Sequence, residues 1–185
     1  PLTDTASYGR PSVFDTTRTA SAVRVVSFLQ RGRFNTPPKW SSLHRMRIAT
    51  WNVNSVKARL ETVTAWLAEA APDVACLQEI KCVDEAFPRE AFEALGYNVE
   101  THGQKTYNGV ALLTRAPLTA DDVVRNIPGF ADDSARVIAA TVPAPGGPLR
   151  VVNGYFVNGQ APGSDKFDYK MSWLRGLRDW LREEL

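Results

Sequence analysis

The sequence predicts an α/β domain that begins with a β-α-β unit and continues with a strand meander. Three observations favour this class. Two short apolar strands flank an amphipathic helix between residues 47 and 79, strand-like segments follow between residues 97 and 156, and the chain ends in a second amphipathic helix. Strands joined through a helix run parallel, whereas strands joined by short turns pair antiparallel. We therefore expect a mixed, largely antiparallel sheet with flanking helices.

The β-α-β unit occupies residues 47–79. "RIATWNV" (47–53) is an apolar strand, and "PDVACLQE" (72–79) is a short buried strand. Between them, "VKARLETVTAWLAEA" (56–70) repeats apolar residues at the spacing of one helical face. The residues of that face are Val56, Leu60, Val63 and Leu67.

The second half of the chain has a short helix, several strands and a long terminal helix. "FPREAFEALG" (87–96) is a short helix that ends at Gly96. The predicted strands are "YNVETH" (97–102), "NGVALLTR" (108–115), "RVIAATV" (136–142) and "LRVVNGYF" (149–156). Residues 168–185 form an amphipathic helix with one apolar face made of Met171, Leu174, Leu177 and Leu181.

Composition predicts one domain preceded by an unpatterned segment. The chain has 185 residues, of which 44% are hydrophobic, enough for one core. Residues 1–45 are rich in Ser, Thr, Arg and Pro, lack helical or strand periodicity and carry seven Lys or Arg against two Asp or Glu. We expect loop or disorder there. Because patterning starts at Met46, we interpret residues 1–45 as a leader outside the domain; a transit peptide and a disordered basic arm are the alternatives.

The same composition predicts a cytoplasmic protein without a membrane anchor. The two cysteines, Cys76 and Cys82, do not suggest a disulfide framework. No apolar run approaches the roughly 18 residues needed to span a bilayer, and the start lacks a signal-peptide pattern. The formal net charge of +2 is too small to indicate nucleic-acid binding by itself.

Polar side chains end the two strands of the β-α-β unit. Asn52 ends the first strand, and Gln78 and Glu79 end the second. Because neighbouring strand tips form one rim in a layered α/β protein, Asn52 and Glu79 can meet there. One carboxylate and one amide oxygen suit Mg²⁺ or Mn²⁺ in a phosphate-processing site. Taken singly, the Asn is more typical of a turn and the Glu of a solvated charge.

The order of several motifs resembles the endonuclease/exonuclease/phosphatase superfamily, and within it the exonuclease III branch of abasic-site endonucleases. The motifs are "ATWNVNS", "PDVACLQEIK", "YNVETHGQKTYNGVALLTR", "ARVIAATV" and "VVNGYFVNG". The resemblance covers residues 46–185 and implies that they are the N-terminal half of the family domain. That domain is a four-layer α/β/β/α sandwich, so we expect its first half, with the second sheet missing.

The resemblance also implies roles for individual residues. Glu79 is then the principal metal-binding carboxylate, and Asn52 supports the metal or the scissile phosphate. Tyr155 is the catalytic tyrosine that hydrogen-bonds the phosphate, and Asn158 contacts DNA phosphate. Val157 stands where many relatives have Pro, a departure that loosens this turn.

Further DNA contacts are predicted from residue type alone. Lys81 follows Glu79, and Lys105, Tyr107 and Asn108 lie in the "GQKTYNG" turn. Cationic and amide groups on a rim can hold phosphates without reading sequence. A solvated turn without ligand is the alternative.

The resemblance implies a Mg²⁺- or Mn²⁺-dependent DNA phosphodiesterase that acts on duplex DNA at abasic sites and 3′ ends. Relatives activate the attacking water with a "GDxN" and an "SDH" motif, and neither string occurs in these 185 residues. We therefore expect this chain to be inactive alone and the full-length protein to be a monomer. The alternatives are a non-catalytic DNA-binding or interaction fragment and a phosphatase of the same fold acting on small or lipid phosphates.

Overall fold

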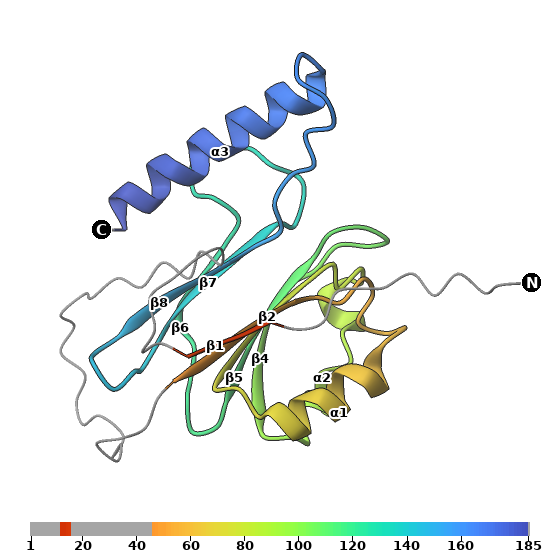
Figure 1. Cartoon of the computed structure of the whole chain (residues 1–185), viewed down its shortest axis with the longest axis vertical. Helices are drawn as coiled ribbons and strands as arrows, with labels where there is room; N and C mark the ends of the chain where they lie inside the picture. Colours follow the sequence, from red (N-terminus) through yellow and green to blue (C-terminus); the bar gives the residue numbers. More distant parts are fainter. Residues whose placement is uncertain (1–11, 16–45, 185) are drawn as a thin grey trace, which may run out of the picture.

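The chain folds into two β-sheets packed face to face with helices on both outer sides (Figure 1). The computed structural model describes residues 12–15 and 46–184. The larger sheet has the strand order β1-β2-β3-β5-β4, and the smaller has the order β6-β7-β8. The strands of the larger sheet are β1 (Ser12–Asp15), β2 (Arg47–Asn52), β3 (Val74–Gln78), β4 (Tyr97–His102) and β5 (Val110–Arg115). The smaller sheet contains β6 (Asp121–Arg125), β7 (Val137–Val142) and β8 (Leu149–Gly154).

The helices cover the two outer faces. Helices α1 (Leu60–Ala70) and α2 (Arg89–Glu93), with the 3₁₀ turn η1 (Asp84–Ala86), lie on the larger sheet, and α3 (Asp165–Glu183) lies on the smaller one. The β2-α1-β3 unit makes β2 and β3 parallel, and the other described strand pairs are antiparallel. Helix α2 ends at Glu93, three residues before the expected Gly96, and turns continue to Gly96, which has a φ of +80°. No helix in the described ranges is both long and apolar enough to cross a bilayer.

Three apolar layers hold the elements together. The central layer lies between the sheets and the outer layers lie under the helices. In the central layer, residues of β2, β3 and β5 such as Ile48, Val74 and Leu112 pack on residues of β7 and β8 such as Ile138 and Val151, and all are at most 2% exposed. Complete removal of both faces from water is the main stabilising term for such a sandwich.

The expectation that the second sheet is missing was wrong. The chain contains three strands of that sheet and the helix that covers it, so all four layers of the α/β/β/α sandwich are present (Figure 1). The strand pattern could not reveal this, because antiparallel strands give no local sign of which sheet they join. Strands β7 and β8 cover the apolar face of the larger sheet that a missing second sheet would have left exposed.

Other boundaries also differ from the sequence predictions. Helix α1 begins at Leu60, four residues later than its apolar spacing indicated, although Val56 is also fully buried. The buried stripe of α3 is made of Trp173, Leu177 and Trp180, so Met171 was wrongly placed on that face. The strands β1 and β6 were not predicted, and the expectation of no regular structure in residues 1–45 was wrong at Ser12–Asp15. The rest of that expectation concerns residues outside the described ranges.

Candidate active site

The polar ends of β2 and β3 meet at one edge of the larger sheet. Asn52 and Gln78 are paired residues of these parallel strands, and Glu79 follows directly. Nδ2 of Asn52 donates a hydrogen bond of 2.7 Å to Oε1 of Glu79. Backbone bonds continue past the strand ends, because the N–H of Ser55 donates to the carbonyl of Glu79 at 2.7 Å. The predicted meeting of Asn52 and Glu79 is confirmed.

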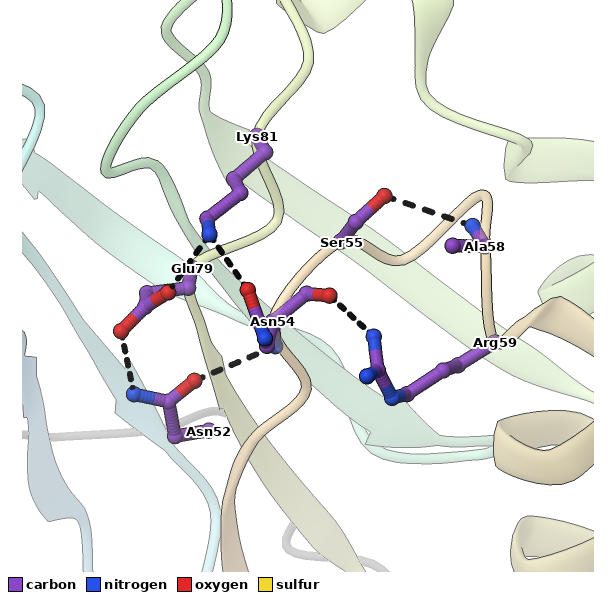
Figure 2. Close-up of polar contacts among 7 residues, drawn as sticks. All are labelled: Asn52, Asn54, Ser55, Ala58, Arg59, Glu79 and Lys81. Atoms are coloured by element: carbon purple, nitrogen blue, oxygen red, sulfur yellow. Dashed lines mark hydrogen bonds and ion pairs between the residues drawn. The ribbon is translucent and has the colours of Figure 1, made fainter. Parts of the chain in front are cut away.

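Two further side chains from the same loops complete a polar cluster (Figure 2). Nζ of Lys81 lies 3.0 Å from Oε2 of Glu79 and also donates to Oδ1 of Asn54. The backbone N–H of Asn54 donates to Oδ1 of Asn52 at 3.1 Å. Both carboxylate oxygens of Glu79 therefore have a nitrogen donor, one an amide and the other an ammonium group.

The second sheet contributes Tyr155, the residue that follows β8. Its hydroxyl lies near enough to the carboxylate of Glu79 for each group to shift the pKa of the other. Its backbone N–H donates to the carbonyl of Arg136 at 2.7 Å, and the Arg136 guanidinium carbon lies 5.3 Å from the centre of its ring. The guanidinium thus stacks on the aromatic ring as a cation–π contact. The site is built where the two sheets meet, and Arg136, interpreted from sequence as a strand residue, lies at its edge.

The charges of the site fix the protonation of Glu79 and Tyr155. Burial raises the pKa of Glu79, but its contacts with Asn52 and Lys81 and the nearby Tyr155 hydroxyl outweigh burial, so this pKa lies below the usual 4.5. Burial raises the pKa of Tyr155 above the usual 10.0, and the nearby Glu79 carboxylate raises it further. At neutral pH Glu79 is an anion and Tyr155 a hydrogen-bond donor.

The donor set fits a hard divalent cation that keeps most of its water. Glu79 supplies carboxylate oxygens, and Asn52 and Asn54 supply amide oxygens. Oxygen ligands of this kind suit Mg²⁺ or Mn²⁺, which take their remaining ligands from water and phosphate. Among the described residues no group of three or more His, Cys, Asp or Glu side chains could hold a metal by itself. A single carboxylate implies weak binding unless a phosphate adds charge.

The turn between β4 and β5 lies beside this cluster. Tyr107 is 69% exposed and Lys105 is also exposed, so both can meet a ligand. Asn108 is turned inward, since its Nδ2 donates to Oε1 of Gln104 at 2.8 Å. The carbonyl of Asn108 accepts from the N–H of Lys81 at 3.1 Å, which joins the turn to the Glu79 loop.

Asn158 lies in the loop between β8 and α3. Its side chain is exposed, and its Oδ1 accepts from the N–H of Gln160 at 3.0 Å. The preceding Val157 is 5% exposed and packs in the apolar layer under α3. The structure therefore leaves Asn158 accessible but shows no contact between it and the Glu79 cluster.

Sequence reasoning missed several residues of the site. Asn54 was quoted in the first motif but given no role, and Arg136 was assigned to a strand. The buried amide of Asn153, two residues before Tyr155, also lies between the sheets and hydrogen-bonds to Gln78. The signal for Asn153 was an amide inside an otherwise apolar strand, "LRVVNG".

Comparisons with known proteins agree with this geometry. Residues 49–184 match the model of the Endonuclease/Exonuclease/phosphatase family. The chain is 40% identical over 144 residues to exodeoxyribonuclease III of Haemophilus influenzae, covering 75% of this chain and 52% of that protein.

Solved structures with the same fold include an exonuclease and an AP endonuclease. The 3′-5′ exonuclease NExo of Neisseria meningitidis is 44% identical with a TM-score of 0.70, over 75% of this chain and 52% of that one. An AP endonuclease of Archaeoglobus fulgidus is 36% identical with a TM-score of 0.69, over 76% of this chain and 52% of that one.

The chain thus spans about half the length of the relatives it matches. The family match covers nearly the whole of the described sandwich, including both sheets and the loops that carry Asn52, Glu79 and Tyr155. On the evidence of its sequence and its four-layer fold, the chain belongs to the endonuclease/exonuclease/phosphatase family.

Proposed function

We propose that this chain supplies the N-terminal part of the active site of a metal-dependent DNA phosphodiesterase of the exonuclease III type. The full-length protein would cleave the backbone on the 5′ side of abasic sites and trim 3′ ends during base excision repair. The observation that carries the proposal is Glu79. It contacts the amide of Asn52 and the ammonium group of Lys81, and the phenol of Tyr155 from the second sheet is near enough to lower its pKa.

Each of these groups suits one task in phosphodiester hydrolysis. Glu79, with an amide oxygen of Asn52, would hold Mg²⁺ or Mn²⁺, which when bound neutralises charge on the phosphate oxygens. Tyr155 keeps its proton at neutral pH and can therefore donate a hydrogen bond to a phosphate oxygen. Lys81 places a positive charge 3.0 Å from the carboxylate, within reach of a phosphate bound there.

The surroundings of the cluster suit a phosphate backbone. Lys105 and Tyr107 are exposed on the adjoining turn, and Asn158 is exposed on the loop before α3. Asn108 would contact a phosphate through its backbone, or through its side chain once its hydrogen bond to Gln104 is broken. The partner we propose is duplex DNA with abasic sites or 3′ ends, met by a monomer in the cytoplasm. The names of the relatives, exodeoxyribonuclease III, 3′-5′ exonuclease and AP endonuclease, support a DNA substrate.

Activation of the attacking water requires groups beyond those described in this cluster. Neither "GDxN" nor "SDH" occurs in the 185 residues. The matched relatives extend over about twice the aligned length. We therefore propose that hydrolysis needs a second half equivalent to the unmatched part of those relatives.

The test combines metal binding with strand incision. The 185-residue chain is titrated with Mn²⁺ and is assayed on a duplex with one abasic site, with and without the second half of the Haemophilus influenzae enzyme. The key variant is Glu79→Gln. Its matched control is Glu69→Gln, the same chemical change at an exposed residue near the end of α1.

We expect the chain alone to nick at a rate at least about a hundredfold below the intact Haemophilus enzyme, with a large gain when the second half is added. Glu79→Gln should abolish Mn²⁺ binding and this gain, and Glu69→Gln should change neither. Unchanged incision by Glu79→Gln would contradict the assignment. DNA binding without incision in any combination would favour the non-catalytic alternative, and faster release of phosphate from small phosphomonoesters would favour the phosphatase.

A further inference from the structure

The turn between β4 and β5 has a strained backbone. Residues 103–109 connect the two strands. Thr106, Asn108 and Gly109 have φ values of +72°, +53° and +80°. Such left-handed backbone is disfavoured for a β-branched residue such as Thr and persists only where neighbouring groups hold it. The hydrogen bonds around the turn should therefore show what holds it.

The side-chain oxygen of Gln104 bridges this turn. Its Oε1 accepts a hydrogen bond from Nδ2 of Asn108 at 2.8 Å and a second from the backbone N–H of Ala135 at 3.0 Å. Because a backbone N–H can only donate, the Ala135 contact fixes which end of the Gln104 amide is the oxygen. One atom thus closes the turn around residues 105–107 and also ties it to the segment before β7.

Both attachment points of the Gln104 bridge are themselves fixed. Ala135 is 3% exposed, and its carbonyl accepts from the N–H of Gly109 at 2.9 Å. The carbonyl of Asn108 accepts from the N–H of Lys81 at 3.1 Å. The bridge therefore holds the turn between the segment that leads into β7 and the loop that follows β3.

The bridge encloses two exposed side chains. Tyr107 is 69% exposed, and Lys105 is also exposed. The backbone N–H of Tyr107 donates to the carbonyl of Lys105 at 2.9 Å. Neither side chain makes a hydrogen bond or an ion pair with the residues that the structure describes. Their direction is therefore set by the backbone of the turn, which Gln104 holds.

We propose that Gln104 is a positioning residue that holds the turn in the shape at which Tyr107 and Lys105 meet the DNA backbone beside the Glu79 cluster. A flexible turn would lose conformational freedom on binding, and a turn that is already ordered avoids that cost. The consequence for DNA rests on the proposed function, but the positioning of the turn does not. A role in stability alone would leave both the order of the turn and the affinity for DNA unchanged when Gln104 is replaced.

Three variants separate the oxygen of Gln104 from its bulk. Gln104→Met keeps the unbranched stem and removes the acceptor, and Gln104→Ala serves if the methionine variant does not fold. Gln104→Glu keeps a carboxylate oxygen that can accept both hydrogen bonds. The matched control is Gln160→Met, the same chemical change at an exposed glutamine in the loop before α3.

The first measurement uses the whole chain without metal or DNA. NMR relaxation gives the amide order parameters of Thr106 and Tyr107, which are about 0.85 for rigid backbone and below about 0.6 for flexible backbone. We expect rigid values in the wild type, Gln104→Glu and Gln160→Met, and flexible values in Gln104→Met. Rigid values in Gln104→Met, or flexible values in the wild type or Gln104→Glu, would overturn the positioning role.

The second measurement is the affinity for a duplex with one abasic site, followed by fluorescence anisotropy. Gln104→Met should weaken binding several-fold, because the two side chains on the turn no longer meet the phosphates in one arrangement. The same change should have little further effect where Tyr107→Ala and Lys105→Met are already present. Gln160→Met should bind as the wild type does. Gln104→Glu does not inform on affinity, because its new charge repels DNA.

The two measurements distinguish the positioning role from the proposed function. An equal loss of affinity with and without Tyr107→Ala and Lys105→Met would overturn an action of Gln104 through these two side chains. A flexible turn in Gln104→Met with unchanged affinity would support the positioning of the turn and contradict the proposed DNA contacts of Tyr107 and Lys105.

Discussion

A buried arginine attaches helix α3 to the smaller sheet, and replacing this arginine should lower the free energy of unfolding. Arg150 of β8 is 5% exposed. Its Nε donates to Oε2 of Glu184 at 2.9 Å, and its Nη1 donates to the carbonyl of Asp122 at 2.6 Å. Arg150→Met keeps the unbranched stem and removes the charge. Glu184 then keeps one partner, the indole N–H of Trp180 at 3.0 Å.

The expected loss follows from the burial of the two charges. Breaking a buried ion pair by removing one partner costs about 3 to 5 kcal/mol. The Glu184 side chain is 23% exposed, so water recovers part of its solvation. We therefore expect Arg150→Met to lower the free energy of unfolding by about 2 to 3 kcal/mol. For a chain of this size that corresponds to a fall in Tm of roughly 5 to 10 °C.

Urea unfolding followed by tryptophan fluorescence gives the measurement, because Trp173 and Trp180 lie on the buried face of α3. A double-mutant cycle with Glu184→Gln should give a coupling energy of about 1 to 3 kcal/mol. The control is Arg178→Met, since Arg178 pairs with Asp179 on the exposed side of α3 and its replacement should leave stability nearly unchanged. Equal effects of Arg150→Met and Arg178→Met would refute the reasoning.

Three further changes test other parts of the molecule. Burial raises the pKa of Tyr97 to about 12, so its neutral hydroxyl contributes fully to stability below pH 10, and this contribution is lost as pH rises through 12. Over that interval the free energy of unfolding of Tyr97→Phe should therefore fall by about 2 to 3 kcal/mol less than that of the wild type. Parallel alkaline unfolding curves for the two proteins would contradict this. Lys81→Met should weaken binding of duplex DNA several-fold at low salt and much less at high salt, whereas a salt-independent loss measured by fluorescence anisotropy would point to a structural effect instead. Gly103→Ala should displace the turn before Tyr107, because its new Cβ would lie 2.5 Å from the carbonyl oxygen of Cys82; wild-type hydrogen-exchange protection in that turn would exclude the displacement.

The meeting of the strand ends was predictable from local pattern alone. A helix between two apolar strands implies a parallel pair, and parallel neighbours bring their carboxyl ends to one edge. Asn52 and Glu79 follow from this rule, and they lie in hydrogen-bond contact. The motif order added Tyr155, whose pKa the same carboxylate raises. Tyr155 follows a strand of the other sheet, so periodicity by itself could not have found it.

The second sheet was beyond the reach of pattern reasoning for a different reason. Strand β6, "DDVVR", has no buried residue and contains three charged side chains, so its apolar signal is limited to the partly buried Val123 and Val124. Its pairing with β7 comes from backbone bonds that any sequence can make. The apolar strands β5 and β7 look alike in sequence, yet one belongs to each sheet and they pack across the central layer. Only long-range packing decides this, because local propensity is the same in both sheets.

The backbone that presents the site is equally invisible in the residue pattern. Asn54, Glu79 and Lys81 all have left-handed backbone, with φ values of +44°, +54° and +54°. Asn adopts this conformation readily, but Glu and Lys do so at a cost of about 1 to 3 kcal/mol each. The neighbouring loops hold them there through backbone bonds, including Ser55 N–H to the Glu79 carbonyl and Lys81 N–H to the Asn108 carbonyl. Since these bonds join segments far apart in sequence, the direction of the Glu79 carboxylate is set by the tertiary fold, and a short peptide carrying "LQEIK" should not reproduce it.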